Sequence, residues 1–368
     1  MQRTRAGTVL GAGIAAALAF AGCGTNSNGS SPGGSSSGAG NCVSGSLKGA
    51  GSSFQDPMEQ TWIAGYAQKC SGTTISYQAV GSGAGIQQFG SGTINYAGSD
   101  VTMKPDEQSK ADSTCGSKAV HIPVTAGGVG VTYKLSGVQS LQLSAPTIAM
   151  IFTGKVKFWD DGAVKADNPG ASLPHTAVHP FVRSDDSGTT AVFSGFLAAA
   201  GGSAWTLGAP AKHINWPSSD QGKPQSAGVS GAVAQTNGGV TYVEEAFATQ
   251  HKLALAKVKN AGGTYVELNA ANVSKALETA TLASNGDPND LSQKINFVPT
   301  DASAYPISTV SYVIVCTRYP SSFSGVALLK AYLTYAVTTG QAQAISLGFA
   351  PLPSSLATKA QSSVAAIS

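Results

Sequence analysis

The sequence predicts an α/β fold, and three features of the chain support that prediction. From Ser46 onward, short apolar segments alternate with turns rich in glycine and serine and with segments of helical spacing. Hydrophobic residues make up 42% of the 368 residues, which is enough for one large or two medium domains with buried cores. The 45 glycines therefore indicate tight turns and close backbone approaches rather than disorder.

The individual strands and helices are predicted from their apolar periodicity. Alternation, or a short apolar run, predicts strands at residues 74–80, 94–98, 121–133, 240–243 and 311–316. The long segment 121–133 is expected to be interrupted at Gly127 and Gly128. Met58, Trp62 and Tyr66 recur at helical spacing and predict a helix over their segment. The predicted helices are 55–68, 146–153, 191–200 and 326–337.

The N-terminal segment predicts export across a membrane. Arg3 and Arg5 form a short basic region before an apolar stretch at residues 9–20. A transmembrane helix needs about 20 apolar residues, so this shorter stretch is typical of a cleaved export signal, here residues 1–22. The net charge of +3, with no run of lysine or arginine, argues against nucleic acid as a partner.

Lipidation is predicted at Cys23. Ala21 and Gly22 directly precede this cysteine and resemble a bacterial lipobox, in which the cysteine receives a diacylglyceryl group and becomes the new N-terminus. The alternative is an ordinary signal with an incidental cysteine. Residues 24–40 contain 12 glycines and serines in 17 positions and no charge, which favours a flexible tether. A lipidated cysteine and tether over residues 23–44 would hold the folded body on the extracytoplasmic face of the cell membrane.

The four remaining cysteines indicate two disulfide bonds, because an even number in an exported chain is typical of paired cysteines. They are Cys42, Cys70, Cys115 and Cys316, and their spacing matches no metal-binding pattern. Three connectivities are possible. Pairing Cys42 with Cys70 is favoured because these two residues flank one strand–helix unit, which leaves Cys115 with Cys316.

One arrangement recurs three times: an apolar strand, a turn rich in glycine and hydroxyl residues, and a helix. The turns lie at residues 49–54, 81–85 and 184–190. A helix N-terminus has free N–H groups and the positive end of the helix dipole, so it binds oxyanions without net charge. Small residues let the backbone approach a ligand, and hydroxyl groups add donors. A single such turn is more often a simple helix cap, but three in one chain indicate an anion site.

Two kinds of charged residue stand beside these turns. Arg183 offers a planar fork suited to phosphate or sulfate oxygens, and Asp185 can orient that fork; the alternative is a surface ion pair. Asp100 follows a strand, where a carboxylate beside a bound anion is favourable only if the anion carries a proton to donate. Phosphate carries one at neutral pH and sulfate does not. The alternative for Asp100 is a helix N-cap or a turn residue.

Eight longer motifs follow one another between residues 47 and 353. They are GAGSSF (49–54), GSGAG (81–85), GSD (98–100), PTIAMIFTGKVKFWDD (146–161), VRSDDSGTT (182–190), GGVTYVEEAFA (238–248), YPIS (305–308) and TTGQAQAISLGFAPLP (338–353). In these motifs the chain resembles the PstS family, the phosphate-binding components of Pst-type ABC importers. The resemblance implies a type II periplasmic-binding-protein fold, α/β and two-lobed, with the ligand cleft between the lobes. Lobe 1 would comprise residues 45–133 and 306–368, and lobe 2 residues 134–305.

The resemblance also implies the binding residues and the partners. The expected ligand is inorganic phosphate, and the expected partners are the membrane permease subunits of an ABC transporter with their cytoplasmic ATPase. No cofactor, metal ion or catalytic residue is implied. Asp185 is expected to orient Arg183 without contacting the ligand itself. Ser53 stands where threonine is commoner in the family, and it keeps the hydroxyl group. The implied phosphate-binding residues are Ser52, Ser53, Phe54, Ser82, Asp100, Arg183, Ser187, Gly188 and Thr189.

Three other classes of protein are less consistent with these residues. A sulfate or molybdate receptor would set the bare carboxylate of Asp100 against a fully deprotonated anion. A secreted serine hydrolase or phosphatase would need a GxSxG elbow, but Val80 stands two residues before Ser82. An adhesion or immune-interaction protein would leave the cluster at residues 183–189 unexplained. None of the histidines has a metal-binding spacing; they are His121, His175, His179, His213 and His251.

Overall fold

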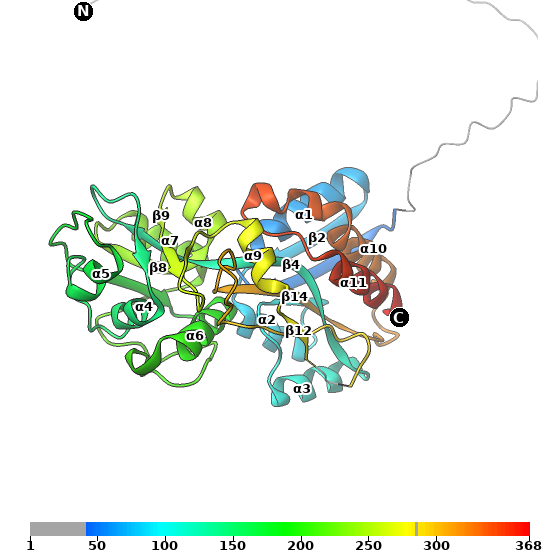
Figure 1. Ribbon diagram of the computed structural model, residues 1–368. Coiled ribbons are helices and arrows are strands. Elements are labelled where there is room, and N and C mark those ends of the chain that lie inside the picture. Colours follow the sequence, from blue (N-terminus) through cyan, green and yellow to red (C-terminus); the bar gives the residue numbers. More distant parts are fainter. Residues whose placement is uncertain (1–41, 284–285) are drawn as a thin grey trace, which may run out of the picture. The chain divides into compact units, whose positions relative to one another are not determined.

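The computed structural model describes residues 42–283 and 286–368, so the predicted signal peptide, Cys23 and residues 24–40 of the tether lie outside the described residues. The described chain is mixed α/β, as the sequence predicts (Figure 1). None of its described helices combines the length and apolar character needed to cross a membrane. The helices are α1 (Asp56–Lys69), α2 (Ser82–Gly90), α3 (Pro105–Cys115), α4 (Ala145–Phe152), α5 (Gly162–Asp167), α6 (Gly188–Ala200), α7 (Gln225–Ala234), α8 (Glu245–Gln250), α9 (Ala270–Leu277), α10 (Val326–Val337) and α11 (Ser354–Ala366).

One curled sheet of nine strands runs through the described chain in the order β2-β1-β3-β14-β4-β8-β6-β7, with β9 added beside β4. Its strands are β1 (Gly45–Gly51), β2 (Thr73–Gln78), β3 (Tyr96–Ser99), β4 (Ala119–Lys134), β6 (His179–Arg183), β7 (Gln221–Lys223), β8 (Gly239–Glu244), β9 (Ala254–Leu255) and β14 (Ser308–Cys316). Two small sheets hold the remaining strands, β5 (Gln142–Leu143), β10 (Lys257–Lys259), β11 (Tyr265–Val266), β12 (Thr281–Leu282) and β13 (Gln293–Lys294).

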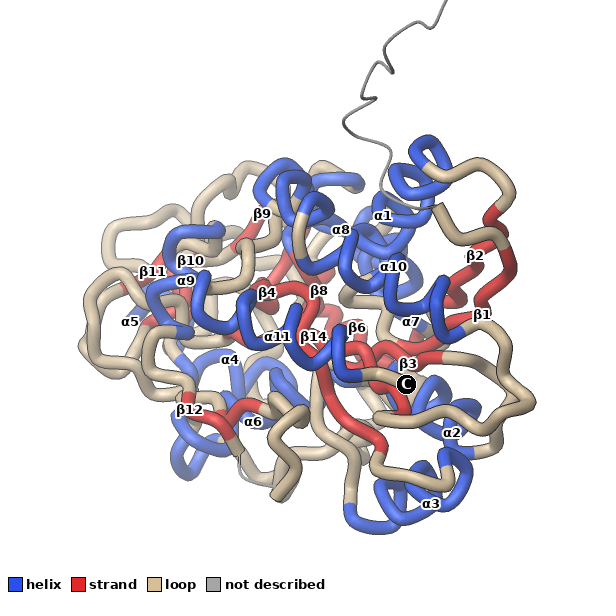
Figure 2. The backbone as a smooth tube through the Cα atoms, turned by 90° about the vertical axis from the view of Figure 1, so that its right-hand side faces the viewer, coloured by secondary structure: helices blue, strands red, loops and turns tan. Residues whose placement is uncertain are grey.

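The helices gather around the two ends of this sheet. In Figure 1, α4 to α7 surround β8 at one end, while α1 and α10 lie beside β1 and β2 at the other. Figure 2 shows α11 crossing the middle of the sheet, where it packs against β4 and α10. The long strand β4 and its neighbour β14 lie in the middle of the sheet and join its two ends.

β4 changes its partner halfway along its length. As far as Gly128 it pairs with the antiparallel strand β14, and from Val129 onward it pairs with β8. The sequence predicts an interruption at the two glycines, and that prediction is wrong, because the strand is continuous. Glycine is instead needed at both positions because neighbouring side chains leave no room for a Cβ atom. A Cβ at Gly127 would lie 2.7 Å from the Phe54 ring, and one at Gly128 would lie 2.4 Å from Leu268.

The core explains why these segments fold as they do. The helical spacing of Met58, Trp62 and Tyr66 puts all three side chains on the buried face of α1. Every residue of β14 is buried, as is β4 except for its last residue, which fits their apolar composition. Burial of this kind contributes about 25 cal/mol per Å² of apolar surface and holds the central strands in place.

The favoured disulfide pairing is confirmed. Cys42 is bonded to Cys70, which ties the segment before β1 to the end of α1. Cys115 is bonded to Cys316, which ties the end of α3 to the end of β14 across a sequence separation of 201 residues. The two bonds therefore close one short and one very long loop of the chain.

Candidate functional site

The three turns singled out in the sequence all lead into helices at one place in the fold. The first precedes α1 and follows β1, as predicted. The second does not end before its helix: α2 already begins at Ser82, inside the glycine-rich segment. The third leads into α6, which begins at Gly188 rather than at residue 191, because the Ser187 hydroxyl accepts a hydrogen bond from the Thr190 N–H and caps the helix.

Asp100 lies at the centre of a buried cluster of hydroxyl groups. Its carboxylate accepts hydrogen bonds from Ser52 Oγ at 2.6 and 2.7 Å and from Ser311 Oγ at 2.6 Å. Ser82 Oγ lies 3.4 Å from the same carboxylate. The side chain is 2% exposed and does not cap α3, whose N-cap is Lys104. Asp100 is therefore held in place by neutral donors from three separate elements.

Arg183 ends β6 and points toward a second cluster. Its Nε donates to Asp185 Oδ1 at 2.8 Å, and its Nη2 is hydrogen-bonded to the other oxygen of that carboxylate. Its Nη1 donates to Ser226 Oγ at 3.2 Å. Ser226 Oγ lies 3.0 Å from Ser53 Oγ, which follows β1 at the other end of the sheet. This chain of contacts joins β6 and α7 to the segment that follows β1.

The N-terminus of α6 approaches the Asp100 cluster very closely. A Cβ added to Gly188 would lie 2.4 Å from Ser82 Oγ and 2.5 Å from Asp100 Oδ2, so only glycine fits there. The Gly83 N–H also donates to the Asp186 carbonyl oxygen at 2.9 Å. The free N–H groups of the first turn of α6 therefore face the hydroxyl groups around Asp100.

The carboxyl groups of the site differ in their electrostatic surroundings. Burial raises the pKa of Asp100, and the hydrogen bonds from Ser311 and Ser52 and the charge of Arg183 offset only part of that shift. Burial also acts to raise the pKa of Asp185, but the hydrogen bond and charge of Arg183 outweigh it and lower the pKa overall. Asp185 is thus a stable anionic partner of Arg183, whereas Asp100 has no ion pair among the described residues.

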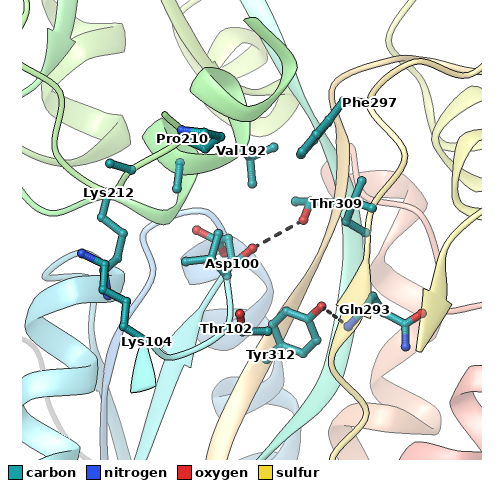
Figure 3. Close-up of a pocket in the computed structure, with 14 residues that line it drawn as sticks. Asp100, Thr102, Lys104, Val192, Pro210, Lys212, Gln293, Phe297, Thr309 and Tyr312 are labelled. Carbon is teal, nitrogen blue, oxygen red and sulfur yellow. Dashed lines mark hydrogen bonds between the residues drawn. The ribbon is translucent and has the colours of Figure 1, made fainter. Parts of the chain in front are cut away.

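A pocket of about 300 Å³ adjoins Asp100 on one side. Figure 3 shows Asp100 between Lys104 and Lys212 on one side and Thr309 on the other, with Val192 and Phe297 above. Of the residues implied by the family resemblance, Asp100 alone lines this pocket. Lys212 is buried and forms an ion pair with Glu107 of α3.

The buried His121 belongs to a hydrogen-bonded cluster with Asp290 and Ser292. His121 Nε2 accepts a hydrogen bond from the Met103 N–H at 3.0 Å, and its Nδ1 lies 2.8 Å from Asp290. Ser292 Oγ donates to the other Asp290 oxygen at 2.7 Å and also lies 3.2 Å from His121 Nδ1. No group of three or more metal-ligating side chains occurs in residues 42–283 and 286–368.

Three residues of the site were not identified from the sequence. Ser226 lies in the first turn of α7, which follows β7, and that short strand contains no apolar residue. Ser311 is a small hydroxyl residue of β14, as are Ser308 and Thr309. Glu244 directly follows the predicted strand 240–243, and a carboxylate at the end of a buried strand was the signal that could have revealed it.

Comparisons with known proteins agree with this fold. The PBP superfamily domain matches residues 36–339, so the class is that of the periplasmic-binding-protein fold. The structure is similar to that of PfluDING, a high-affinity periplasmic phosphate-binding protein solved with phosphate, with a TM-score of 0.71 and 21% identity over 86% of this chain and 93% of that one. It is also similar to a phosphate-binding protein from Stenotrophomonas maltophilia, with a TM-score of 0.65 and 22% identity over 86% of this chain and 93% of that one.

The sequence relatives are closer. The chain is 35% identical to phosphate-binding protein PstS 3 of Mycobacterium tuberculosis, over 100% of both chains. It is 34% identical to phosphate-binding protein PstS 2 of the same organism, again over 100% of both chains. The chain belongs to the PstS family.

Proposed function

We propose that the protein captures inorganic phosphate outside the cytoplasm and delivers it to the permease subunits of an ABC importer. The observation that carries this proposal is the position of Asp100, a buried carboxylate surrounded by hydroxyl groups opposite the N-terminus of α6. A bound anion there is compatible with the carboxylate only if it donates a proton to it. Phosphate does so near neutral pH, and the relatives are named as phosphate-binding proteins.

The donors for the anion would come from both lobes. From lobe 1 we assign Ser52, Ser53, Phe54 and Ser82, together with Asp100 as the acceptor. From lobe 2 we assign Arg183, Ser187, Gly188 and Thr189, with Asp185 fixing the guanidinium. Neutral donors at a helix N-terminus stabilise an oxyanion without adding net charge, which suits a chain with 11% charged residues.

Binding and release would depend on movement of the two lobes. Lobe boundaries at residues 45–133 with 306–368, and at 134–305, remain a proposal, supported by the change of partner along β4 a few residues before the first boundary. Cross-lobe contacts such as Ser53 with Ser226 and Lys212 with Glu107 would break when the lobes separate. This role requires no catalytic step, so the protein is proposed to be a receptor and not an enzyme.

The proposed location is the extracytoplasmic face of the cell membrane, through a lipid on Cys23. Stable anchoring requires more than one acyl chain, as a lipidated cysteine provides. Replacing Cys23 with alanine is expected to move the protein from the membrane fraction to the medium, or to leave an unprocessed precursor. Retention of the variant in the membrane at the wild-type level and size would contradict the anchor.

The direct test of phosphate binding is calorimetry with wild type and Arg183→Ala, both stripped of ligand. Hydrogen bonds to a charged group contribute about 1.5–3 kcal/mol, so the variant is expected to bind phosphate at least about tenfold more weakly. Arg318→Ala, which removes an exposed arginine, is the matched control and should bind as the wild type does. Equal phosphate affinity in all three proteins would show that Arg183 is not part of the site.

A further inference from the structure

Glu244 belongs to the site, but the proposed set of phosphate-binding residues gives it no role. It ends β8 and is 1% exposed. Its Oε1 accepts a hydrogen bond from Thr189 Oγ1 at 2.9 Å. Its Oε2 is buried without a hydrogen-bond partner among the described residues. A buried carboxyl oxygen without a partner is costly when the group is ionised, which points to a role for this side chain.

The charges around Glu244 do not compensate for its own. It has no ion pair in the described part of the chain. Arg183, on the adjacent strand β6, favours its ionised form, but that guanidinium is already paired with Asp185. Asp100, facing it from the loop after β3, disfavours the ionised form, whereas hydrogen bonds from the Glu244 backbone N–H and from Ser226 of α7 favour it. Thr189 of α6 is uncharged and donates to Oε1. Burial is the largest effect and raises the pKa of Glu244 to about 6.

The hydrogen bond to Thr189 has a consequence for anion binding. A hydroxyl group has one proton to donate. When Glu244 is ionised, Thr189 donates that proton to Oε1 and has only lone pairs left for a bound anion. When Glu244 is protonated, it can donate to Thr189 Oγ1, and the threonine hydroxyl is then free to donate to the anion. The protonation state of Glu244 thus decides whether Thr189 attracts or repels an anion oxygen.

We propose that Glu244 is a positioning residue that takes up a proton when phosphate enters the cleft, and so turns the Thr189 hydroxyl into a donor for the anion. The incoming negative charge adds to that of Asp100 and makes the ionised form of Glu244 still less favourable. Proton uptake relieves this repulsion and supplies the donor in the same step. The proposal rests on phosphate binding at this site.

The test is calorimetry of phosphate binding to wild type and Glu244→Gln, in pairs of buffers with different ionisation enthalpies. The dependence of the measured heat on the buffer gives the number of protons exchanged. Phosphate exchanges protons itself, so the difference between the two proteins isolates Glu244. Near pH 7 the wild type is expected to take up more protons than the variant, by up to about one per phosphate. At about pH 4.5, where Glu244 is already protonated, the difference should vanish.

The matched control is Glu245→Gln. Glu245 is the next residue along the chain, and burial and the charge of Glu267 raise its pKa too, but it does not contact Thr189. Its substitution should leave proton uptake at the wild-type value. The affinity of the wild type should also fall more steeply than that of E244Q as the pH rises from about 6 to about 8.

The possible failures can be told apart. If the wild type does not bind phosphate in any buffer, the proposed function is wrong and this inference falls with it. If both proteins bind phosphate and exchange equal numbers of protons near pH 7, only the role of Glu244 is refuted. Should E244Q not fold, selective ¹³Cδ labelling of glutamate in the wild type decides: one carboxyl group must show a higher pKa with phosphate than without, and no such shift overturns the inference.

Discussion

The Asp100→Asn substitution removes one negative charge from the cleft while nearly preserving the shape of the side chain. The asparagine side chain retains one carbonyl oxygen for the hydrogen bonds from Ser52 and Ser311, and its amide group becomes a donor toward a bound anion. Phosphate loses the acceptor for its proton, whereas sulfate, which has only acceptors, loses a repulsive neighbour. The substitution therefore acts in opposite directions on the two anions.

The size of the effect depends on the distance between a bound anion and the Asp100 carboxylate. A Cβ at Gly188 would lie only 2.5 Å from Asp100 Oδ2, so the start of α6 is close to the carboxylate. We therefore take a separation of about 4 Å between a bound anion and Asp100. Two unit charges at 4 Å repel by roughly 4 kcal/mol at an effective dielectric constant near 20. Removing even half of this repulsion increases sulfate affinity more than tenfold. Loss of a charge-assisted hydrogen bond weakens phosphate binding by about 1.5–3 kcal/mol.

The assay is parallel titration of ligand-free wild type and variant with phosphate and with sulfate. It is done near pH 8, at fixed ionic strength, because salt screens exposed charges. Asp56→Asn is the matched control, since burial raises the pKa of Asp56 as well, but this residue begins α1 and accepts a hydrogen bond from Gln60. The ratio of phosphate to sulfate affinity should fall by two orders of magnitude or more in D100N and stay constant in D56N.

Two results would refute this reasoning. An unchanged ratio in D100N would make Asp100 a structural turn residue, held by its serines for reasons of folding alone. Sulfate binding by the wild type as tight as that of phosphate would instead favour the sulfate-receptor alternative, because the carboxylate would then not exclude a fully deprotonated anion.

Two further predictions concern stability. Burial raises the pKa of Glu59 from 4.5 to about 7, so its contribution to stability is complete below pH 4.5 and is lost as the pH rises through about 7. Urea denaturation of the ligand-free protein should therefore show the free energy of unfolding of the wild type falling by about 3 kcal/mol relative to Glu59→Gln over this range, and parallel pH profiles would contradict it. Replacing Cys115 and Cys316 with serine should lower the free energy of unfolding by about 5 kcal/mol, and replacing Cys42 and Cys70 by less, because the latter pair closes a shorter loop. Equal losses from the two double substitutions would contradict the loop-entropy reasoning.

Much of the fold could be predicted from local patterns. The periodicity of Met58, Trp62 and Tyr66 identified α1, and the apolar run ending at Cys316 identified β14, because each element buries one continuous face or both faces. The pairing of Cys115 with Cys316 was reached by elimination, since nothing local links residues so distant in sequence. Contacts between residues distant in sequence were harder to predict than the individual helices and strands.

The errors have physical causes as well. Gly127 and Gly128 break a strand by propensity, but here the close packing of Phe54 and Leu268 requires glycine and the ladder continues. The start of α6 was placed too late because Gly188 and its threonines are poor helix formers by propensity. The cap from Ser187 and the contact with Asp100, both set by tertiary structure, outweigh that propensity.

In the proposed site, the groups that would attract an anion differ from those that would select phosphate over sulfate. The charge of Arg183 is paired with that of Asp185, so in the proposed site Arg183 would act on an anion mainly through its N–H donors. The other attraction would come from N–H and O–H dipoles, such as those of α6 and of the serines near Asp100, and all these donors would serve sulfate as well as phosphate. Discrimination would then be left to the carboxyl groups without an ion pair among the described residues, Asp100 and Glu244, because only these would respond to whether the ligand carries a proton. Adding cations to such a site would strengthen binding of every oxyanion and weaken the selection of one.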